Sequence, residues 1–213
     1  MSILFSAILV AFVQLFPILN PPAMAPVFQE ITHGIPDRQR NLIALKVAIY
    51  TFYLLASLLL VGGWFLRILG VSIEMFGITG GILLFHTAWG MLNRNDRLTT
   101  SEREEIKVMS GKVFFPLTMP MTAGPGSIAV TLAMTPLGNL LAIDSMLQVI
   151  GLCIGIGVTS FTVWVFYRYS GPFLSRLGKT AKATIGQISA FVLLAIGVQL
   201  IWKNLSHLIK TLL

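Results

Sequence analysis

Six long apolar segments decide what this chain can fold into. Each is long enough to cross a bilayer as a helix, which takes roughly 20 residues. They lie near residues 3–29, 43–66, 71–92, 113–136, 145–167 and 184–203. Only 11% of the 213 residues are charged, whereas an average soluble domain carries roughly 25%. The sequence therefore predicts an all-α multipass membrane protein, with six transmembrane helices in a single integral membrane domain, residues 1–213.

The first and fourth segments are interrupted by proline and glycine. Proline has no backbone N–H and clashes with the carbonyl group four residues earlier, so a regular helix cannot pass through such a stretch. We expect the first segment to divide at Asn20-Pro21-Pro22, with Asn20 as N-cap and Pro21 in the first turn of the second half. We expect the fourth to divide between Thr122 and Gly126, with Pro125 opening its second half.

The two broken segments also resemble each other. Between residues 16 and 26, four residues recur 99 positions later. The matched residues are Phe16, Pro17, Pro21 and Pro26, and Phe115, Pro116, Pro120 and Pro125. Ile78-Thr79-Gly80 similarly matches Ile188-Ser189-Ala190 in the sixth segment. The chain therefore reads as two three-helix repeats, residues 1–92 and 113–213, joined by a loop over residues 93–112.

The basic residues predict the orientation. Twelve of the 15 Lys and Arg residues lie in the connections after the first, third and fifth segments. Positive loops face the cytoplasm, which places both termini outside. Because each repeat has three spans, the two repeats have opposite topology. Positive-inside bias explains these basic loops without a nucleic-acid partner.

The breaks are the candidate binding site. A helix that starts within the membrane presents free N–H groups and a partial positive charge, and a helix that ends there presents free carbonyl groups. Broken helices in matching positions of two repeats are the best sequence indication of a transporter site. The candidate substrate-binding residues are Asn20, Pro21, Pro22, Thr118, Thr122, Ala123, Gly124, Pro125, Gly126 and Ser127.

Each of these residues also has a structural alternative. The prolines and glycines could merely kink two helices for packing. The polar side chains could hydrogen-bond a substrate or could satisfy freed backbone groups. Gly124 and Gly126 could admit a ligand to the main chain, or could allow tight helix packing.

His86 is an ionisable residue well inside the third segment, whereas Glu74 lies near its start. His86 is a candidate for proton coupling, because ionisable groups inside a membrane are commonly functional. The alternative is a neutral His bonded to a neighbouring helix. The sequence shows no arrangement of nucleophile, base and orienting residue, and no metal-ligand spacing, so we expect neither an enzyme nor a cofactor or metal site.

Two stretches carry a family resemblance. Residues 20–27, Asn-Pro-Pro-Ala-Met-Ala-Pro-Val, and residues 119–129, Met-Pro-Met-Thr-Ala-Gly-Pro-Gly-Ser-Ile-Ala, resemble the MarC family of bacterial inner-membrane proteins. Gly80-Gly81 and Gly197-Val198-Gln199 extend the resemblance over essentially the whole chain. It implies six spans in the cytoplasmic membrane and a transporter, because relatives include carriers of small neutral amino acids. Many members carry Arg where this chain has Gly77 and Gln187, so the resemblance does not carry over at those two positions.

We therefore expect a secondary transporter for a small polar solute, with a neutral amino acid as the leading candidate and coupling to protons or sodium. A membrane protein with an envelope or partner-binding role, and a passive small-solute channel, are the alternatives.

Overall fold

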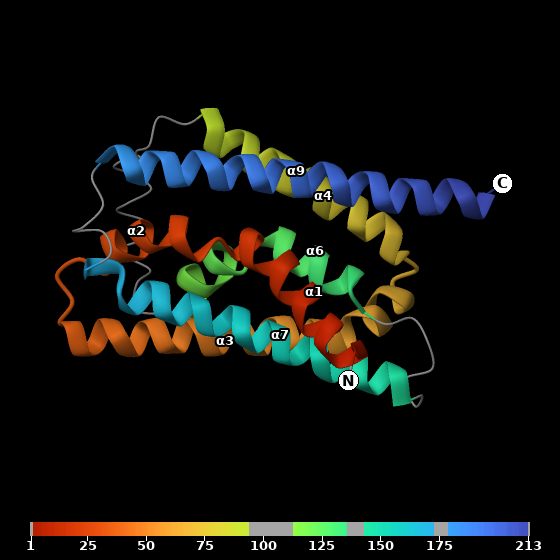
Figure 1. The fold of residues 1–213 in the computed structure, drawn as a ribbon, viewed down its shortest axis with the longest axis horizontal. Coiled ribbons are helices and arrows are strands. Elements are labelled where there is room, and N and C mark those ends of the chain that lie inside the picture. The colour runs from red at the N-terminus through yellow and green to blue at the C-terminus, as the bar shows by residue number, and fades with distance from the viewer. Residues whose placement is uncertain (1, 94–112, 136–142, 173–178, 213) are drawn as a thin grey trace.

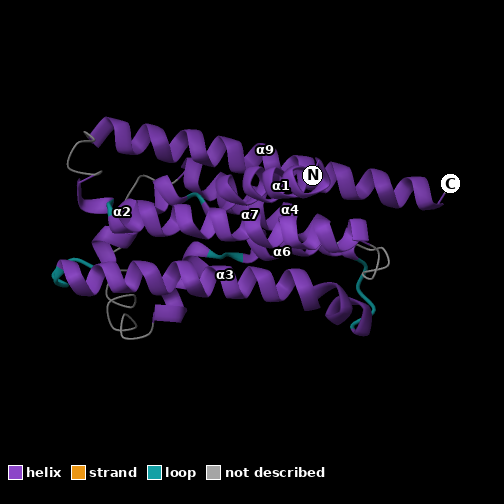
Figure 2. Ribbon diagram, turned by 60° about the horizontal axis from the view of Figure 1, so that its bottom comes forward, coloured by secondary structure: helices purple, strands orange, loops and turns teal. Residues whose placement is uncertain are grey.

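The computed structural model describes residues 2–93, 113–135, 143–172 and 179–212. Within these ranges every regular element is a helix and no strand occurs (Figure 2). The all-helical prediction is therefore confirmed for the described part of the chain. The connecting loop expected over residues 93–112 lies, apart from its first residue, outside the described residues.

The described residues before the connecting loop hold four of the helices named below, and those after it hold the other four. Their bounds are α1 Ser2–Leu19, α2 Pro21–Ile31, α3 Asp37–Ile68, α4 Ile73–Asn93, the π-helix η1 Val113–Thr122, α6 Pro125–Ala133, α7 Ile143–Arg168 and α9 Lys179–Leu212. The long helices α3 and α9, of 32 and 34 residues, extend well beyond the apolar segments expected there.

The helices form three layers (Figure 1). α3 and α7 pack against each other on one side, and α4 and α9 do so on the other. The interrupted helices α1, α2, η1 and α6 lie between these two pairs. α1, α2 and α6 each contact both pairs, and η1 contacts α3. The broken segments are thus enclosed by continuous helices. That is where non-helical backbone is tolerated at membrane depth, because protein rather than lipid surrounds it.

Four helices are long and apolar enough to cross a membrane: Asp37–Ile68, Ile73–Asn93, Ile143–Arg168 and Thr184–Lys210. A fifth crossing is formed if α1 and α2 count as one span, bent by 44° between Leu19 and Pro21. The segment expected over residues 113–136 is split into η1 and α6, of 10 and nine residues, and neither half could cross alone. The chain is a multipass membrane protein with four or five apolar spans among its described helices.

Glycine brings the helix backbones close together. A Cβ atom added at Gly155 of α7 would lie 2.6 Å from Cβ of Ala11 and 2.7 Å from the carbonyl oxygen of Ile8, both on α1. A Cβ at Gly81 of α4 would lie 2.8 Å from the carbonyl oxygen of Gly197 on α9. Small residues allow this approach, which is typical of helix contacts in membranes, where close van der Waals packing contributes much of the association.

Gly77 belongs to the same α4–α9 contact. A Cβ atom there would lie 2.5 to 2.8 Å from the side-chain atoms of Asn204 on α9, so this position has no room for a long side chain. Gln187, in contrast, is exposed on α9. The two positions where many family members carry Arg therefore have different surroundings in this chain.

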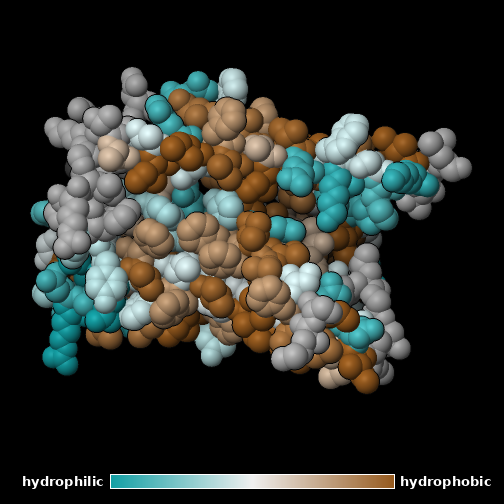
Figure 3. Space-filling model, viewed as in Figure 1, coloured by the Kyte–Doolittle hydropathy of each residue, from teal (hydrophilic) through white to brown (hydrophobic). Residues whose placement is uncertain are grey.

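Apolar side chains cover most of the face seen in Figure 3, and polar ones gather towards its two ends. Many large apolar residues are exposed, among them Trp64, Phe161 and Trp202. In water such a surface would aggregate, whereas a bilayer solvates it. The surface pattern agrees with the transmembrane assignment.

Candidate functional site

The first break falls at Asn20, as the sequence predicts. Asn20 has φ 45° and ψ 56°, in the left-handed region, and it separates α1 from α2, which begins with Pro21 and Pro22. Asparagine is one of the few residues that tolerate this backbone conformation. The expected capping role of its side chain is wrong, because the side chain makes no capping hydrogen bond. With proline at the next two positions, the first turn of α2 has few N–H groups to cap.

The second break lies between Thr122 and Pro125, also as predicted. Pro125 is the first residue of α6 and Gly124 is its N-cap, with φ −81° and ψ 175°. This is extended backbone that any residue can adopt, so a left-handed conformation at Gly124 is ruled out. Before the break the backbone is a π-helix, in which Ala123 N donates to Thr118 O at 2.7 Å. π-Turns are rare and are often found at functional sites.

The structure brings the two breaks together in the middle layer. α1 contacts α6, and α2 contacts η1, so each half of one broken helix meets the opposite half of the other (Figure 1). The predicted site residues at this crossing are mostly buried. The buried ones are Asn20, Pro21, Thr118, Thr122, Ala123, Gly126 and Ser127. Pro22 and Gly124 are half-buried, and Pro125 is exposed.

Asn20 is the unusual polar residue at the crossing. It is only 4% exposed, yet its side-chain Nδ2 has no hydrogen-bond partner. A buried donor without an acceptor costs about 1–3 kcal/mol. The three hydroxyl groups near the second break are satisfied within their own helices instead. Thr118 donates to Val113 O, Thr122 to Leu117 O and Ser127 to Gly124 O. All three hydroxyl protons therefore go to backbone carbonyl groups of their own chain segment.

The two glycines of the second break also differ from each other. A Cβ atom at Gly126 would overlap Cδ2 of Leu84 on α4, so Gly126 allows tight helix packing. Gly124 is half-buried at the N-cap position. Ser127 N and Ile128 N both donate to its carbonyl oxygen, at 3.0 and 3.3 Å.

Tyr167 of α7 joins the two broken helices and was missed by the sequence analysis. Its ring is fully buried and stacks on Phe28 of α2, with centroids 4.4 Å apart and planes 16° from parallel. Its hydroxyl oxygen lies 2.9 Å from Thr122 Oγ1. The Thr122 hydroxyl proton is already donated to Leu117 O, and a hydroxyl has one proton, so Tyr167 is the donor.

A sequence signal for Tyr167 does exist. On α7 the buried residues Gly151, Gly155, Thr159, Val163 and Tyr167 recur every four positions. This spacing puts them on one helix face, and its small members mark a close helix contact. Because Tyr167 continues this face, the spacing predicts that it is buried. Its position near the end of a span, taken alone, would instead predict an aromatic residue at the membrane interface.

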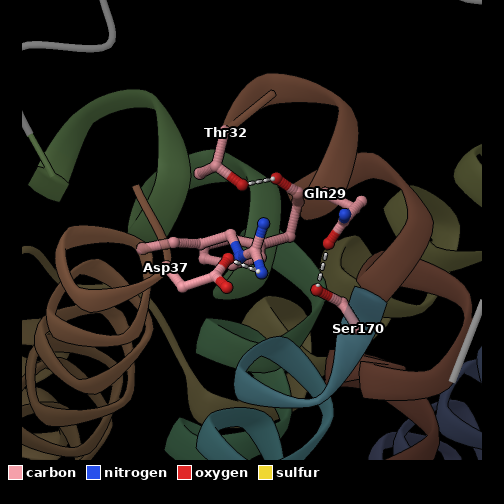
Figure 4. Close-up of polar contacts among 6 residues, drawn as sticks. Gln29, Thr32, Asp37 and Ser170 are labelled. Atoms are coloured by element: carbon pink, nitrogen blue, oxygen red, sulfur yellow. Dashed lines mark hydrogen bonds and ion pairs between the residues drawn. The ribbon is translucent and has the colours of Figure 1, made fainter. Parts of the chain in front are cut away.

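A second set of polar contacts lies beyond Tyr167, where α2 ends and α3 begins (Figure 4). The Ser170 hydroxyl donates to Gln29 Oε1 at 2.7 Å and so joins the chain just after α7 to α2. Thr32 donates to Phe28 O at 2.7 Å. Arg40 pairs with Asp37 at 2.6 Å, while its Nε is buried without a partner. Of these contacts, the Ser170–Gln29 hydrogen bond is the one that joins separate segments, because the Thr32 bond lies at the end of α2 and the Arg40–Asp37 pair lies within α3.

His86 lies apart from this site. It is exposed on α4, between the exposed residues Ile82 and Trp89. Its exposure distinguishes it from the buried residues of the crossing, although Leu84, two residues earlier on α4, packs on Gly126 of the second break. Among the described residues His86 makes no hydrogen bond to a neighbouring helix. Among the residues that the structure describes, no three His, Cys, Asp or Glu side chains come together as metal ligands would.

Comparison with known proteins gives the family. The model of the MarC family of integral membrane proteins matches residues 5–209. A UPF0056 membrane protein of Aquifex aeolicus is 32% identical over 203 residues, covering 94% of this chain and 92% of that protein. The UPF0056 membrane protein YvbG of Bacillus subtilis is 29% identical over 217 residues, covering 98% and 99%. A UPF0056 membrane protein of Methanocaldococcus jannaschii is 32% identical over 197 residues, covering 91% and 93%.

No solved structure matches this chain. The family match spans both breaks and every described helix from α1 to α9, and the relatives match over nearly their full lengths. The chain belongs to the MarC family of integral membrane proteins.

Proposed function

We propose that this chain is a secondary transporter for a small polar solute, and that the solute is a neutral amino acid. The observation that carries the proposal is the buried side-chain Nδ2 of Asn20, which has no hydrogen-bond partner where two broken helices cross. A group that costs free energy in the empty protein is stabilised when a ligand supplies the missing acceptor. The carboxylate of an amino acid is such an acceptor.

The backbone at the crossing suits both charged groups of an amino acid. Pro21 and Pro22 have no N–H, so the carbonyl groups of Pro17 and Ile18 receive no donor from four residues later. These carbonyl oxygens would accept from an ammonium group. At the other break, the N–H of Gly126 has no acceptor within α6, and the helix N-terminus carries a partial positive charge. That end would bind the carboxylate.

The helix contacts support two inverted repeats of three spans each, α1–α2, α3 and α4 against η1–α6, α7 and α9. Under this pairing, each contact from the first repeat to the second has an equivalent from the second to the first. The α1–α7 contact matches the η1–α3 contact, and the α4–α6 contact matches the α9–α2 contact. The third helices α4 and α9 contact each other, as do the second helices α3 and α7. In this arrangement the solute site lies near the repeat interface, and alternating access comes from movement of one repeat against the other.

The excess of basic residues after the first, third and fifth spans supports an orientation with both termini outside the cytoplasmic membrane. In that orientation a cytoplasmic gate of the solute site lies beyond the breaks. It is formed by Tyr167, Phe28 and the Gln29–Ser170 contact.

A passive channel needs a continuous polar path, and the closely packed residues at the crossing disfavour one. Coupling to protons or sodium is part of the proposal, whereas an enzymatic activity is not.

Counter-exchange in proteoliposomes tests the proposal. Vesicles loaded with unlabelled alanine should accumulate external radiolabelled alanine, and the rate should saturate. An imposed proton or sodium gradient should drive net uptake if that ion is coupled. A channel would give flux without saturation, and a protein with an envelope or partner-binding role would give none. Either result, obtained with a panel of neutral amino acids, would overturn the proposal.

Asn20→Gly is the sharpest variant, because glycine keeps the left-handed backbone and removes the amide. Loss of one hydrogen bond of about 1 kcal/mol should raise the half-saturation concentration roughly five-fold. Asn93→Gly is the matched control, because Asn93 is exposed and bonds only to Trp89 O of its own helix. Equal half-saturation concentrations for Asn20→Gly and the unchanged protein would remove Asn20 from the site.

A further inference from the structure

The outer face between α3 and α7 carries an apolar groove that the proposed transport cycle does not use. Two adjoining cavities, of about 480 and 440 Å³, share Phe52, Gly157 and Phe161 in their walls. Both volumes fall in the range of small-molecule sites. Gly157 has no side chain to fill the groove, and a Cβ atom there would reach only the Phe52 ring, at 3.6 Å. The groove is open towards the side from which lipid would approach.

One wall of the groove carries an unsatisfied polar group. Ser160 of α7 lines the groove and is 4% exposed, and its hydroxyl has no hydrogen-bond partner. Thr159 and Thr162, on either side of Ser160, donate instead to carbonyl groups of α7. A buried hydroxyl without a partner costs free energy, which an acceptor supplied by a ligand would recover. The unpaired hydroxyl of Ser160 therefore suits a ligand that is mostly apolar and carries a hydrogen-bond acceptor partway along its length.

The end of the groove is basic. Trp164 lines it, and the Arg168 guanidinium lies over the Trp164 ring, 5.1 Å from its centroid. Arg168 also lies 5.7 Å from the Tyr169 ring centroid, and among the described residues it pairs with no carboxylate. Ser160, Trp164 and Arg168 are spaced by four residues, so they share one face of α7. Arg168 is about 12 Å further along the helix axis than Ser160.

We propose that this groove binds a phospholipid with an anionic headgroup. One acyl chain lies along Phe52 and Gly157, an ester carbonyl accepts the hydrogen bond of Ser160, and the phosphate pairs with Arg168. The order of the three contacts along α7 is the order of tail, ester and headgroup in the lipid. The Arg168 guanidinium already lies over the Trp164 and Tyr169 rings, so an ion pair with phosphate loses little side-chain freedom.

A second copy of the chain fits this face less well. Two copies in one membrane share their orientation, and a two-fold axis would bring the same residues of both copies together. Arg168 of each copy would then lie at the same depth, near its equivalent, and like charges repel. Lys46, exposed on α3 next to the groove residue Leu45, would add to the repulsion. An anionic lipid is instead attracted by both basic side chains.

Native mass spectrometry of the purified protein tests the proposal, after exchange into detergent with equal amounts of phosphatidylglycerol and phosphatidylcholine. The unchanged protein should retain one phosphatidylglycerol at least five-fold more often than phosphatidylcholine. Arg168→Gln should abolish this preference, and Ser160→Ala should reduce retention at least two-fold. Arg67→Gln is the control for charge, because Arg67 is exposed near the far end of α3.

Gly157→Leu fills the groove and should abolish retention of either lipid. Gly90→Leu is its control, because a Cβ atom at Gly90 meets no other atom within 4 Å. A second readout is Cys153, which lines the groove and is half-buried. Phosphatidylglycerol should slow its reaction with N-ethylmaleimide at least three-fold.

Equal retention of the two lipids by the unchanged protein would overturn the proposal, and so would preference for phosphatidylglycerol that survives Arg168→Gln. A dimer peak that disappears in Gly157→Leu would assign the groove to a second copy instead. If Gly157→Leu fails to fold, Arg168→Gln and Ser160→Ala still decide, because both change only groups that face the groove or lie at its end.

Discussion

Removing the Tyr167 hydroxyl should cost less stability than removing the Thr122 hydroxyl, although the two groups share one hydrogen bond. Tyr167→Phe takes away a donor and leaves Thr122 donating to Leu117 O, so no buried donor becomes unpaired. Its cost should be about 1 kcal/mol, the net value of a hydrogen bond. Thr122→Val leaves the Tyr167 hydroxyl in the core without its acceptor, and it also removes the bond to Leu117 O. Its cost should be about 2–3 kcal/mol.

The double variant gives the decisive number. With both hydroxyl groups gone, the penalty for the unpaired Tyr167 donor disappears, so the double variant should be no less stable than Thr122→Val alone. The coupling energy should be about 1 kcal/mol, within the range of up to about 1.7 kcal/mol found for polar pairs between membrane helices. Additive costs, or a larger cost for Tyr167→Phe than for Thr122→Val, would refute the donor assignment.

Unfolding free energies measured by steric trapping in bicelles, without added solute, are the appropriate assay. Two exposed residues provide controls. Tyr53→Phe removes a hydroxyl from a tyrosine that is 65% exposed, and Thr87→Val removes one that bonds only to Leu83 O of its own helix. Both controls should change stability by less than about 0.5 kcal/mol.

Three further outcomes are expected. Gly155→Ala should lower the unfolding free energy by about 1–3 kcal/mol, because the added methyl group meets the backbone of α1, whereas Gly90→Ala in open space should raise it by about 0.5–1 kcal/mol. His86→Gln should leave counter-exchange and its pH dependence unchanged in proteoliposomes, because the His86 side chain is exposed on α4 and the residues of the crossing are buried; a lost pH dependence would restore it as a proton relay. Cysteines at Ser101 and Asn139, in a cysteine-free background, should label from opposite sides of the membrane with an impermeant maleimide, and labelling of both from outside would contradict the inverted repeats.

The positions of both breaks could be predicted because proline acts locally. Pro21 and Pro125 open helices in the structure where the sequence places them. The matched proline pattern does not, however, put the breaks at matched residues. Pro120 corresponds to Pro21 but lies within η1, where the backbone widens to bonds between residues five apart instead of breaking. The apolar pattern and the helix propensities do not indicate whether the backbone at a proline widens or breaks. That outcome depends on the helices packed around η1.

The partners of the site could not be predicted for a related reason. Asparagine is a residue type that commonly caps helices. In the structure Asn20 adopts a left-handed backbone conformation and its side chain makes no capping hydrogen bond, which leaves the side chain available for another role. Ser127 and Thr122 have hydroxyl groups that could bind a substrate. In the structure both hydroxyls donate to carbonyl groups of their own chain segment. The acceptor to which a hydroxyl donates depends on differences of a few tenths of an ångström in donor–acceptor distance, and no residue pattern specifies these differences.

The close contact between α4 and α9 has a consequence for biosynthesis. α4 ends at Asn93 and α9 begins at Lys179, so the ribosome must make more than 80 further residues before α4 meets its partner. Until then the glycine face of α4, with Gly77 and Gly81, lies in the membrane without the side chains that later cover it. The order of synthesis thus makes α9 the closing element of assembly, and a chain that ends before α9 would leave α4 open to insertion chaperones and membrane proteases.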